Sequence, residues 1–284
     1  MRTPDMKISV VTVSYNQARF LERTIKSVVS QDYENIEYII VDPGSTDGSR
    51  DIIRDNAGLF SKIVFEPDSG PADGLNKGFS FATGDIFYYL NSDDVALPGA
   101  FSTVVDYFRR FDSADVIYGH GIMIDERDIV TRRLFSRKWH LKSSFFVNNI
   151  VQQATFIRKR MFKAVKGFNH LNTTCWDFEL LVDIAIAGGN FIRVDDALGA
   201  FRMYSDSISG SQRLSDLNKT NFDRIAQKIL GRPLTRFDPL AGLYHKSLNR
   251  VFASKFIAYH LADMVKLRMG LSLGNVPTYG NKRF

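Results

Sequence analysis

The stretch Ile86-Phe87-Tyr88-Tyr89-Leu90 runs directly into Asn91-Ser92-Asp93-Asp94. An uninterrupted apolar run is typical of a strand buried on both faces, and the polar residues after it place two adjacent carboxylates at the rim of a sheet. Hard divalent cations such as Mg²⁺ bind oxygen ligands, and sites that also hold phosphate often use only one or two protein carboxylates. The stretch indicates a metal-bridged phosphate. The alternative is a plain polar turn, because Asn, Ser and Asp are frequent turn residues.

Strand and helix patterns alternate on both sides of this stretch. Apolar and β-branched runs predict strands, and apolar residues at helical spacing predict helices between them. This alternation is typical of βαβ units, so we expect an α/β fold with a mostly parallel sheet flanked by helices. The predicted strands are 8–13, 37–41, 62–66, 85–90 and 116–119, and the predicted helices are 20–30, 49–56, 72–82 and 99–110.

The second half of the chain is less regular. Residues 155–157 and 191–194 predict short strands, and residues 177–187 and 214–230 predict helices. Residues 206–211 are rich in Ser and Gly, which predicts a loop.

Bulk properties narrow the class of protein. The 284 residues are 44% hydrophobic, enough for one large domain or one domain with a subdomain. No apolar run approaches the roughly 18 residues of a membrane span, and the first residues lack a secretory hydrophobic region. The single Cys175 excludes an internal disulfide framework and a Cys-based zinc site. We therefore expect a cytoplasmic enzyme.

The net charge of +6 lies in the last part of the chain. Residues 240–284 hold seven basic residues and one acid, which accounts for the whole excess. Apolar residues interleave with the basic ones at helical spacing, which favours an amphipathic surface helix over a nucleic-acid site. We expect residues 244–268 to make a peripheral contact with an anionic membrane at its inner face. The alternative is a C-terminal helix packed on the domain.

Polar loops follow each of the first four predicted strands: Ser14-Tyr15-Asn16, Asp42 to Gly48, Glu66 to Gly70, and Asn91 to Asp94. In parallel sheets, ligands bind outside the carboxyl ends of the strands, so these loops predict one site. Tyr15 can stack on a nucleobase or pack on the sheet. Asp42 can accept a hydrogen bond from a base or a ribose, or it can cap the next helix together with Ser45 and Asp47.

The helix predicted after the third strand places Asp73 and Asn76 on one face, so both can point into the same crevice. Competing motifs are absent from the sequence. It contains no P-loop, no G-x-G-x-x-G fingerprint, no G-x-S-x-G nucleophile elbow and no His pair at zinc-ligand spacing.

Four segments, in order, resemble the large inverting family 2 of nucleotide-sugar glycosyltransferases, which has the GT-A fold. They are Val11 to Phe20 (VTVSYNQARF), Val41 to Ser49 (VDPGSTDGS), Glu66 to Gly84 (EPDSGPADGLNKGFSFATG) and Leu90 to Asp94 (LNSDD). The resemblance covers roughly residues 7–204. It implies a donor-binding half at 1–125, an acceptor-side half of the same GT-A domain at 126–213, and a helical basic extension at 214–284.

The resemblance also implies roles for the donor-side residues. Asp94 would bind Mn²⁺ or Mg²⁺ on the donor diphosphate, and Asp93 would contact the ribose or the sugar. Ser14, Tyr15, Asn16, Asp42 and Ser45 would hold the nucleotide, and Asp73 and Asn76 would line the donor pocket.

In the second half, Gln152 to Phe156 and Gly167 to Asn169 resemble the acceptor-side segment of the family, with Gln153 in the first of them. Asp177 matches the catalytic aspartate and would take the proton of the acceptor hydroxyl. The alternative for Asp177 is a helix cap. Trp176 would stack on a sugar, and Glu179 is the second candidate base.

Three positions depart from the family pattern. Pro43 follows Asp42 where a second Asp is frequent, Trp176 precedes Asp177 where an acid is frequent, and Arg202-Met203-Tyr204 stands where Arg-x-His is common.

We therefore expect a metal-dependent inverting glycosyltransferase that moves a sugar from a nucleoside diphosphate sugar, such as a UDP-sugar, to a glycan or lipid-linked acceptor in cell-envelope polysaccharide synthesis. The alternatives are a non-catalytic module of the same fold and a sugar nucleotidyltransferase. A sugar nucleotidyltransferase would need a Gly-rich loop after the first strand, and this chain has no glycine there.

Overall fold

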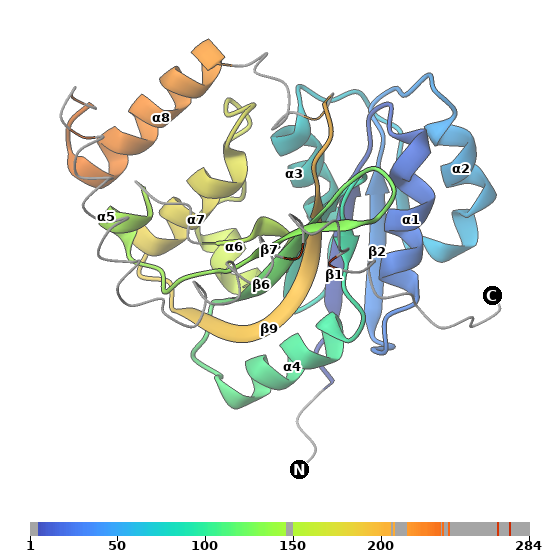
Figure 1. Ribbon diagram of the computed structural model, residues 1–284, viewed down its shortest axis with the longest axis horizontal. Coiled ribbons are helices and arrows are strands. Elements are labelled where there is room, and N and C mark those ends of the chain that lie inside the picture. Colours follow the sequence, from blue (N-terminus) through green and yellow to red (C-terminus); the bar gives the residue numbers. More distant parts are fainter. Residues whose placement is uncertain are drawn as a thin grey trace.

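The computed structural model describes residues 5–145, 150–205 and 215–233, together with residues 207, 235, 238, 266 and 273. The described part contains one nine-stranded sheet with helices packed on both faces (Figure 1). The strands are β1 (Ile8–Val13), β2 (Ile36–Val41), β3 (Lys62–Val64), β4 (Ile86–Asn91), β5 (Val95–Ala96), β6 (Val116–Ile124), β7 (Val130–Leu134), β8 (Thr155–Arg158) and β9 (Phe191–Arg202). The predicted amphipathic segment 244–268 lies almost entirely outside the described residues.

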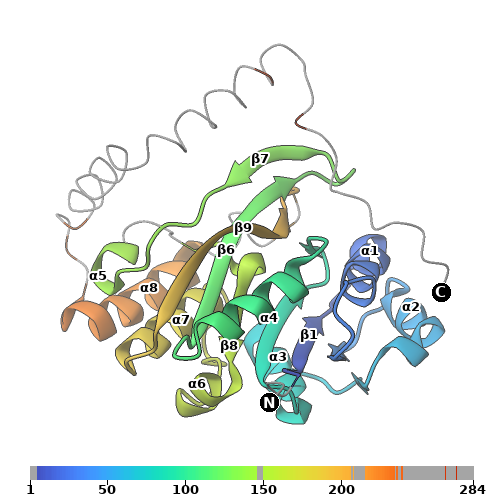
Figure 2. The same ribbon diagram turned by 90° about the horizontal axis from the view of Figure 1, so that it is seen from below.

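Helices connect many of these strands, and all of the described α-helices except α5 and α6 correspond to helices predicted from the sequence. They are α1 (Ala18–Val29), α2 (Ser49–Asp55), α3 (Pro71–Phe81), α4 (Ala100–Arg110), α5 (Leu141–Ser144), α6 (Lys159–Ala164), α7 (Trp176–Ile186) and α8 (Ser215–Leu230). Two short 3₁₀ turns are also present, η1 (Ala57–Leu59) and η2 (Gln152–Ala154). In two perpendicular views, α5, α7 and α8 gather at the end of the molecule that lies away from α1 and α2 (Figures 1 and 2).

The order of the strands predicts a ligand crevice at one rim of the sheet. The order is β3-β2-β1-β4-β8-β6-β9-β5, and β7 pairs with β6. From β1 the chain builds outward through β2 to β3, then returns to add β4 on the other side of β1. Both neighbours are parallel to β1, with Val13 opposite Val41 and Asn91. The strand order therefore reverses beside the carboxyl end of β1, where ligands bind in such sheets.

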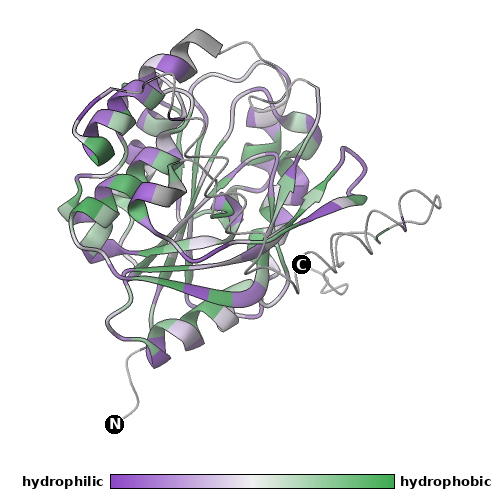
Figure 3. Cartoon of the chain, turned by 60° about the vertical axis from the view of Figure 1, so that its left-hand side comes forward, coloured by the Kyte–Doolittle hydropathy of each residue, from purple (hydrophilic) through white to green (hydrophobic). Residues whose placement is uncertain are grey.

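Alternate residues of the central strands enter two separate hydrophobic cores. Ile8 and Val10 pack with α1, α2 and α4 on one face, whereas Val11 packs with α3, α6 and α7 on the other. Figure 3 shows much hydrophobic colour in the sheet, with hydrophilic stretches on some strands, and mixed colour on the surrounding helices. Because both faces are covered, the strands read as continuous apolar runs in the sequence.

Close packing explains the glycines of α3. A Cβ atom added to Gly78 would lie 2.4 Å from Cγ1 of Val11, and one added to Gly74 would lie 3.2 Å from Cγ1 of Val13. The helix therefore approaches β1 more closely than any residue with a side chain allows, and this sets its first turn against the rim of the crevice.

The second half of the chain completes the same sheet. Strand β8 lies between β4 and β6, antiparallel to both, and β9 is parallel to β6. The prediction of a mostly parallel sheet is confirmed. Two strands were not predicted, β5 and β7, and β9 extends eight residues beyond the predicted end at Val194, to Arg202. The division of the chain at residues 125 and 213 stays a prediction.

Candidate functional site

The two predicted carboxylates lie in the turn between β4 and β5. Asp94 is buried, and its oxygens accept hydrogen bonds from Nε2 of Gln153 at 2.8 Å and from the backbone N–H of Arg202 at 2.9 Å. Gln153 precedes β8 and Arg202 ends β9. The carboxylate at the end of the first-half motif is therefore held by the second half of the chain.

Asp93 is held by Tyr204. The Tyr204 hydroxyl donates a hydrogen bond to Oδ2 of Asp93 at 2.9 Å and accepts one from Nε2 of Gln17 at 2.8 Å. The Tyr204 ring also packs on Phe20 of α1, with ring centroids 5.1 Å apart. Where the family commonly has a His, this chain has a phenol that ties the carboxylate turn to the loop after β1.

Arg202 is fully buried beneath the same turn. Its Nε donates to the backbone oxygen of Asp93 at 2.7 Å, its Nη1 donates to the backbone oxygen of Asp125 at 2.7 Å, and its Nη2 lies 2.6 Å from a carboxylate oxygen of Asp128. The guanidinium also stacks over the ring of Phe20 at 4.6 Å. This charge fixes the backbone of the turn and is neutralised by Asp128.

The electrostatics of the turn disfavour two bare carboxylates. Burial, together with the neighbouring charge of Asp93, raises the pKa of Asp94 well above its usual range. Burial also raises the pKa of Asp93, although the hydrogen bond from Tyr204 acts in the opposite direction. A cation placed between the turn and a phosphate would relieve this repulsion.

The donor set fits a hard divalent cation shared with phosphate. Among the described residues, no three His, Cys, Asp or Glu side chains are arranged to hold a metal by themselves. Mg²⁺ sites with phosphate substrates need only one or two carboxylates, and Asp94 supplies one. Oδ1 of Asp94 accepts a single hydrogen bond, from the backbone of Arg202, which leaves a lone pair for a cation.

A second group of polar atoms lies at the carboxyl ends of β1 and β2. Asp42 is fully buried, and its Oδ1 accepts hydrogen bonds from the backbone of Gly44 and Ser45 and from Nε of Arg50. Its Oδ2 has no hydrogen-bond partner, and neither does the buried hydroxyl of Ser14. Buried polar atoms without partners are costly, so these two indicate a ligand that supplies the missing hydrogen bonds.

The loops around these atoms hold one another. The backbone N–H of Asn16 donates to Oγ of Ser45 at 2.8 Å, and the Asn16 side chain accepts from the backbone of Thr46 at 2.9 Å. Tyr15 is 62% exposed beside them, so its ring is free to stack on a ligand. Asp47 accepts hydrogen bonds from the backbone of Ala18 and Ser49 at the starts of α1 and α2, which matches the capping alternative.

Asp73 and Asn76 lie on α3, as predicted, but both already have protein partners. Oδ2 of Asp73 accepts from the backbone and side chain of Ser69 and pairs with Lys77 at 3.3 Å. The Asn76 amide donates to the oxygen of Phe168 at 2.8 Å and accepts from its N–H at 2.9 Å. Asn76 therefore anchors the turn before α7, and contact with a donor stays a prediction for both residues.

Asp177 lies in the first turn of α7. Burial raises the pKa of its carboxyl above the ordinary value. Burial, followed by the charge of Asp177, raises the pKa of the Tyr89 phenol, which lies two residues before Asn91 on β4. A Cβ atom on Gly70 would lie 3.7 Å from Cγ2 of Thr173, so the turn before α7 adjoins the loop before α3. The predicted base is therefore near the donor-side loops.

The acceptor-side residues need correction. The Trp176 ring is buried in the core beneath the sheet, so stacking on a sugar would require it to leave that core. Gln153 donates a hydrogen bond to Asp94, so it lies at the carboxylate turn instead of at a separate acceptor-side surface. Glu179 is fully buried; burial alone would raise its pKa, but hydrogen bonds from Arg224, Lys228 and two Asn side chains outweigh burial and lower the pKa to about 2. A carboxylate held so tightly as an anion is not a second candidate base.

Three residues near the site were not predicted from the sequence: Gln17, Arg50 and Asp68. Gln17 holds Tyr204, and Arg50 holds Asp42 while stacking over Phe65 at 4.7 Å. Asp68 is half-buried, and burial raises the pKa of its carboxyl. For Gln17 and Asp68, the only sequence feature that indicates a role is their position in a loop after a strand. No sequence motif identifies Arg50.

In the described part of the chain, no helix is both long and apolar enough to cross a membrane.

Proteins with similar sequences are named as glycosyltransferases. An uncharacterized glycosyltransferase of Nostoc is 40% identical over 126 residues, which cover 43% of this chain and 39% of that protein. Glycosyltransferase GlyG of Streptococcus pneumoniae is 27% identical, covering 71% and 72% of the two chains. The putative teichuronic acid biosynthesis glycosyltransferase TuaG of Bacillus subtilis is 24% identical, covering 72% and 82%.

Solved structures share the fold. Staphylococcus aureus TarS 1-349 in complex with UDP-GlcNAc matches with a TM-score of 0.59 at 17% identity, covering 82% of this chain and 69% of that one. The mannosyltransferase PcManGT of Pyrobaculum calidifontis, in complex with GDP-Man and Mn²⁺, also matches with a TM-score of 0.59 at 17% identity, covering 94% and 80%. These likenesses confirm the expected GT-A architecture.

The family model described as glycosyl transferase family 2 matches residues 9–166, which is more than half of the chain. That range contains the carboxylate turn and the loops around Ser14 and Asp42. With the glycosyltransferase relatives and the shared architecture, it confirms the predicted enzyme class. The chain belongs to glycosyltransferase family 2.

Proposed function

We propose that this enzyme moves a sugar from a UDP-sugar to a hydroxyl group of a glycan or lipid-linked acceptor during polysaccharide biosynthesis, with inversion at the anomeric carbon. The observation that carries the proposal is the pair of unpartnered buried atoms, Oδ2 of Asp42 and Oγ of Ser14, at the same rim as Asp93 and Asp94. One set of atoms suits a nucleobase or ribose, and the other suits a diphosphate.

Each residue has a distinct role in this reaction. Asp42, oriented by Arg50, and Ser14 bind the nucleoside, and exposed Tyr15 covers the base. Asp94 would hold Mn²⁺ or Mg²⁺ and Asp93 would contact the ribose; the metal would supply charge stabilisation for the departing diphosphate. Tyr204 and Gln153 keep the two carboxylates in place.

Asp177 acts on the acceptor. Its carboxylate takes the proton of the acceptor hydroxyl as the oxygen forms a bond to the anomeric carbon and the bond to the diphosphate breaks. One displacement inverts the anomeric centre and needs no covalent sugar–enzyme intermediate. The raised pKa of Asp177 makes it a stronger base than an ordinary aspartate.

The relatives and neighbours support the substrate classes. TuaG is named for teichuronic acid biosynthesis, TarS was solved with UDP-GlcNAc, and PcManGT with GDP-Man and Mn²⁺. The first test is a thermal-shift panel of UDP-GlcNAc, UDP-glucose, UDP-galactose and GDP-mannose, each with and without Mn²⁺. A UDP-sugar should raise the Tm, and Mn²⁺ should increase the shift. A larger shift with GDP-mannose would overturn the choice of base.

The second test measures release of the nucleoside diphosphate. The Asp94→Asn variant should lose Mn²⁺-dependent release, and Asp177→Asn should lose turnover while it still binds UDP with the affinity of the parent. Release at the parent level by Asp94→Asn would remove the metal assignment. Loss of UDP binding by Asp177→Asn would move Asp177 out of the role of base.

The location of the acceptor is a separate part of the proposal. The basic segment 244–268 would contact anionic lipid at the inner face of the cell membrane, where a lipid-linked acceptor resides. Vesicles containing phosphatidylglycerol should bind the full chain, and added salt should weaken the binding. Absent or salt-independent binding would favour a helix packed on the domain.

A further inference from the structure

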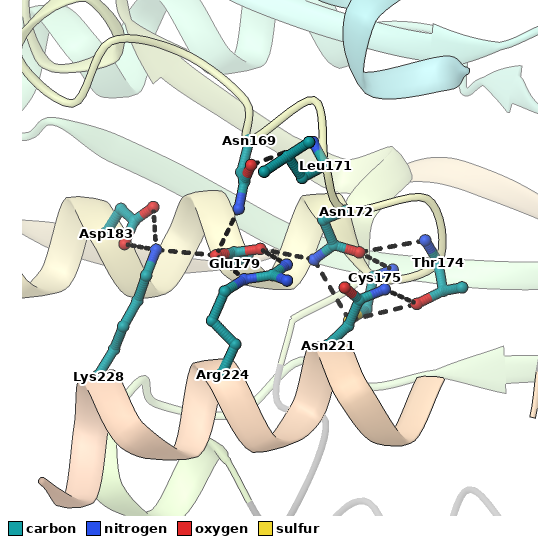
Figure 4. A network of polar contacts seen from close by, with 10 residues as sticks. All are labelled: Asn169, Leu171, Asn172, Thr174, Cys175, Glu179, Asp183, Asn221, Arg224 and Lys228. Carbon is teal, nitrogen blue, oxygen red and sulfur yellow. Dashed lines mark hydrogen bonds and ion pairs between the residues drawn. The ribbon is translucent and has the colours of Figure 1, made fainter. Parts of the chain in front are cut away.

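Figure 4 shows a buried carboxylate, Glu179, on the helix that carries Asp177. Its Oε1 accepts from Nδ2 of Asn169 at 3.0 Å and from Nε of Arg224 at 3.1 Å, and its Oε2 accepts from Nδ2 of Asn172 at 2.7 Å and from Nη2 of Arg224 at 2.8 Å. Nζ of Lys228 lies 2.8 Å from Oε1. The carboxylate thus joins α7, the turn before it and α8.

The turn before α7 is the element that these contacts fix. Oδ1 of fully buried Asn172 accepts hydrogen bonds from the backbone of Thr174 at 3.1 Å and of Cys175 at 3.0 Å. Nδ2 of the same Asn172 side chain donates a hydrogen bond to Glu179. Cys175 is the N-cap of α7 and Asp177 is two residues further on. A short chain of hydrogen bonds therefore runs from Glu179 to the backbone that sets the direction of Asp177.

Helix α8 holds this arrangement from outside. Arg224 supplies a bidentate pair to Glu179, and Nδ2 of Asn221 donates to Oγ1 of Thr174 at 2.8 Å (Figure 4). Both α7 and α8 lie beyond residues 9–166, so the family model does not cover this contact. Purely apolar contacts would also hold two helices together, but fork-shaped hydrogen bonds fix orientation as well as proximity.

We propose that Glu179 and Arg224 are positioning residues, through which α8 holds the first turn of α7 so that the Asp177 carboxylate faces the acceptor hydroxyl. This inference rests on the proposed role of Asp177 as base. A misplacement of about 1 Å at a reacting group can cost roughly a hundredfold in rate, so even a small shift of this turn is measurable.

The reactivity of Cys175 can be used to measure how often this turn opens. Cys175 is its single cysteine and is buried, and burial raises the pKa of the thiol. Its Sγ accepts hydrogen bonds from Asn172 and Thr174. A disulfide reagent such as 5,5′-dithiobis(2-nitrobenzoate) reaches this thiol only when the turn opens, so the labelling rate measures how firmly the turn is held.

The experiment compares three variants of the full chain. Arg224→Met removes the fork, and Arg224→Lys keeps a charge with a single contact. Asp183→Asn is the matched control: Asp183 pairs with Lys228 between the same two helices, 2.7 Å away, and its loss leaves the Arg224 fork and the Lys228–Glu179 pair in place. Folding is checked by circular dichroism and Tm. If Arg224→Met does not fold, Arg224→Lys is compared directly with the parent.

Arg224→Met should label Cys175 at least about tenfold faster, because it loses hydrogen bonds to a buried charge. Its kcat for UDP release from the UDP-sugar that binds best, with water as acceptor, should fall roughly tenfold to a hundredfold, while its Kd for UDP stays within about twofold. Arg224→Lys should recover part of both losses, and Asp183→Asn should match the parent.

The outcomes separate the two proposals. Unchanged labelling of Cys175 in folded Arg224→Met overturns the coupling between α8 and the turn. Faster labelling with parental kcat overturns the positioning role, provided that Asp177→Asn is inactive. Full turnover in Asp177→Asn overturns the proposed base, and with it the positioning role, whatever the labelling shows.

Discussion

The hydroxyl of Tyr204 donates a hydrogen bond to the Asp93 carboxylate at 2.9 Å, across 111 residues of sequence. The same oxygen accepts from Gln17, so one phenol joins the loop after β1, the turn after β4 and the end of β9. Tyr204 occupies the position where an Arg-x-His motif is common in the family. The phenol therefore fixes the position of the Asp93 carboxylate relative to the loop after β1, beside the switch in strand order.

This relationship predicts the effect of Tyr204→Phe. The variant keeps the ring that packs on Phe20 but removes the hydrogen bond to the Asp93 carboxylate. Such bonds to charged groups contribute about 1.5 kcal/mol or more, so the affinity for UDP with Mn²⁺ should fall roughly tenfold. Isothermal titration calorimetry measures it directly.

The control for this change is Tyr107→Phe. Tyr107 donates a similar hydrogen bond to Asp196 at 2.8 Å, but between α4 and β9 and away from the crevice. It should leave UDP affinity unchanged. Equal losses in the two variants would mean that Tyr204 acts on the fold in general.

Asp94→Asn should make the protein more stable as it becomes inactive. The pKa of Asp94 is raised in the folded protein, so its ionisation near neutral pH opposes folding, and this cost is lost when the charge is removed. Gln153 can turn its amide to accept from the new Asn. The free energy of unfolding in urea at pH 7 should therefore be higher for the variant than for the parent.

Asp115→Asn is the control, because the same substitution at this buried position should lower stability instead of raising it. Asp115 is also buried, but it pairs with Arg160 at 3.0 Å and accepts from the backbone of Asn190. The Asn side chain has a single acceptor atom, so either the N–H of Asn190 or Nε of Arg160 would face a donor, and stability should fall by about 1 kcal/mol. If both variants lose stability, the raised pKa of Asp94 is not the dominant effect.

The sequence predicted which loops of the first half lie together, but not the contacts that the second half makes with them. Ser14, Asp42 and Asp94 follow β1, β2 and β4 at one rim, because parallel strands bring their carboxyl ends together, and their contacts with a donor stay predictions. Strand β5 is two residues long, and β7 carries Thr131, Arg132 and Arg133, so neither shows an apolar period. Glu179 resembled a base because its partners Arg224 and Lys228 lie more than 40 residues further along the chain.

Asp42→Asn should change the base preference of the enzyme. The new amide can keep its oxygen toward Gly44, Ser45 and Arg50, which places an NH₂ group where the unpartnered Oδ2 stands. Uracil presents an N–H at N3, whereas cytosine presents an acceptor there. The affinity for UDP should fall roughly tenfold because two donors then face each other, and the affinity for CDP should rise.

Asp47→Ala is the control for base preference. Asp47 accepts hydrogen bonds from the first backbone N–H of α1 and of α2, so its loss should lower stability by about 1 kcal/mol without changing the ratio of UDP to CDP affinity. Competition titrations with the two nucleotides measure that ratio. An unchanged ratio in Asp42→Asn would place the base elsewhere in the crevice.

The pH dependence of turnover should report Asp177. A base must be unprotonated, and burial raises the pKa of this carboxyl, so kcat should increase with pH through a pKa above that of an ordinary aspartate. The free energy of unfolding should change with pH in the opposite direction from kcat. Because the folded pKa exceeds the unfolded value, the contribution of Asp177 to stability is greatest at low pH and is lost as pH rises through the folded pKa.

The two trends can be separated on the same samples. Initial rates of UDP release at saturating donor give the rising limb of kcat, and urea unfolding at each pH gives the stability. In Asp177→Asn the limb should disappear from the residual rate, and the decrease in stability over that pH range should become smaller. Asp68 also has a raised pKa, so Asp68→Asn must be measured beside it. A limb that survives in Asp177→Asn and disappears in Asp68→Asn would assign the titration to the donor-side loop instead of to the acceptor base.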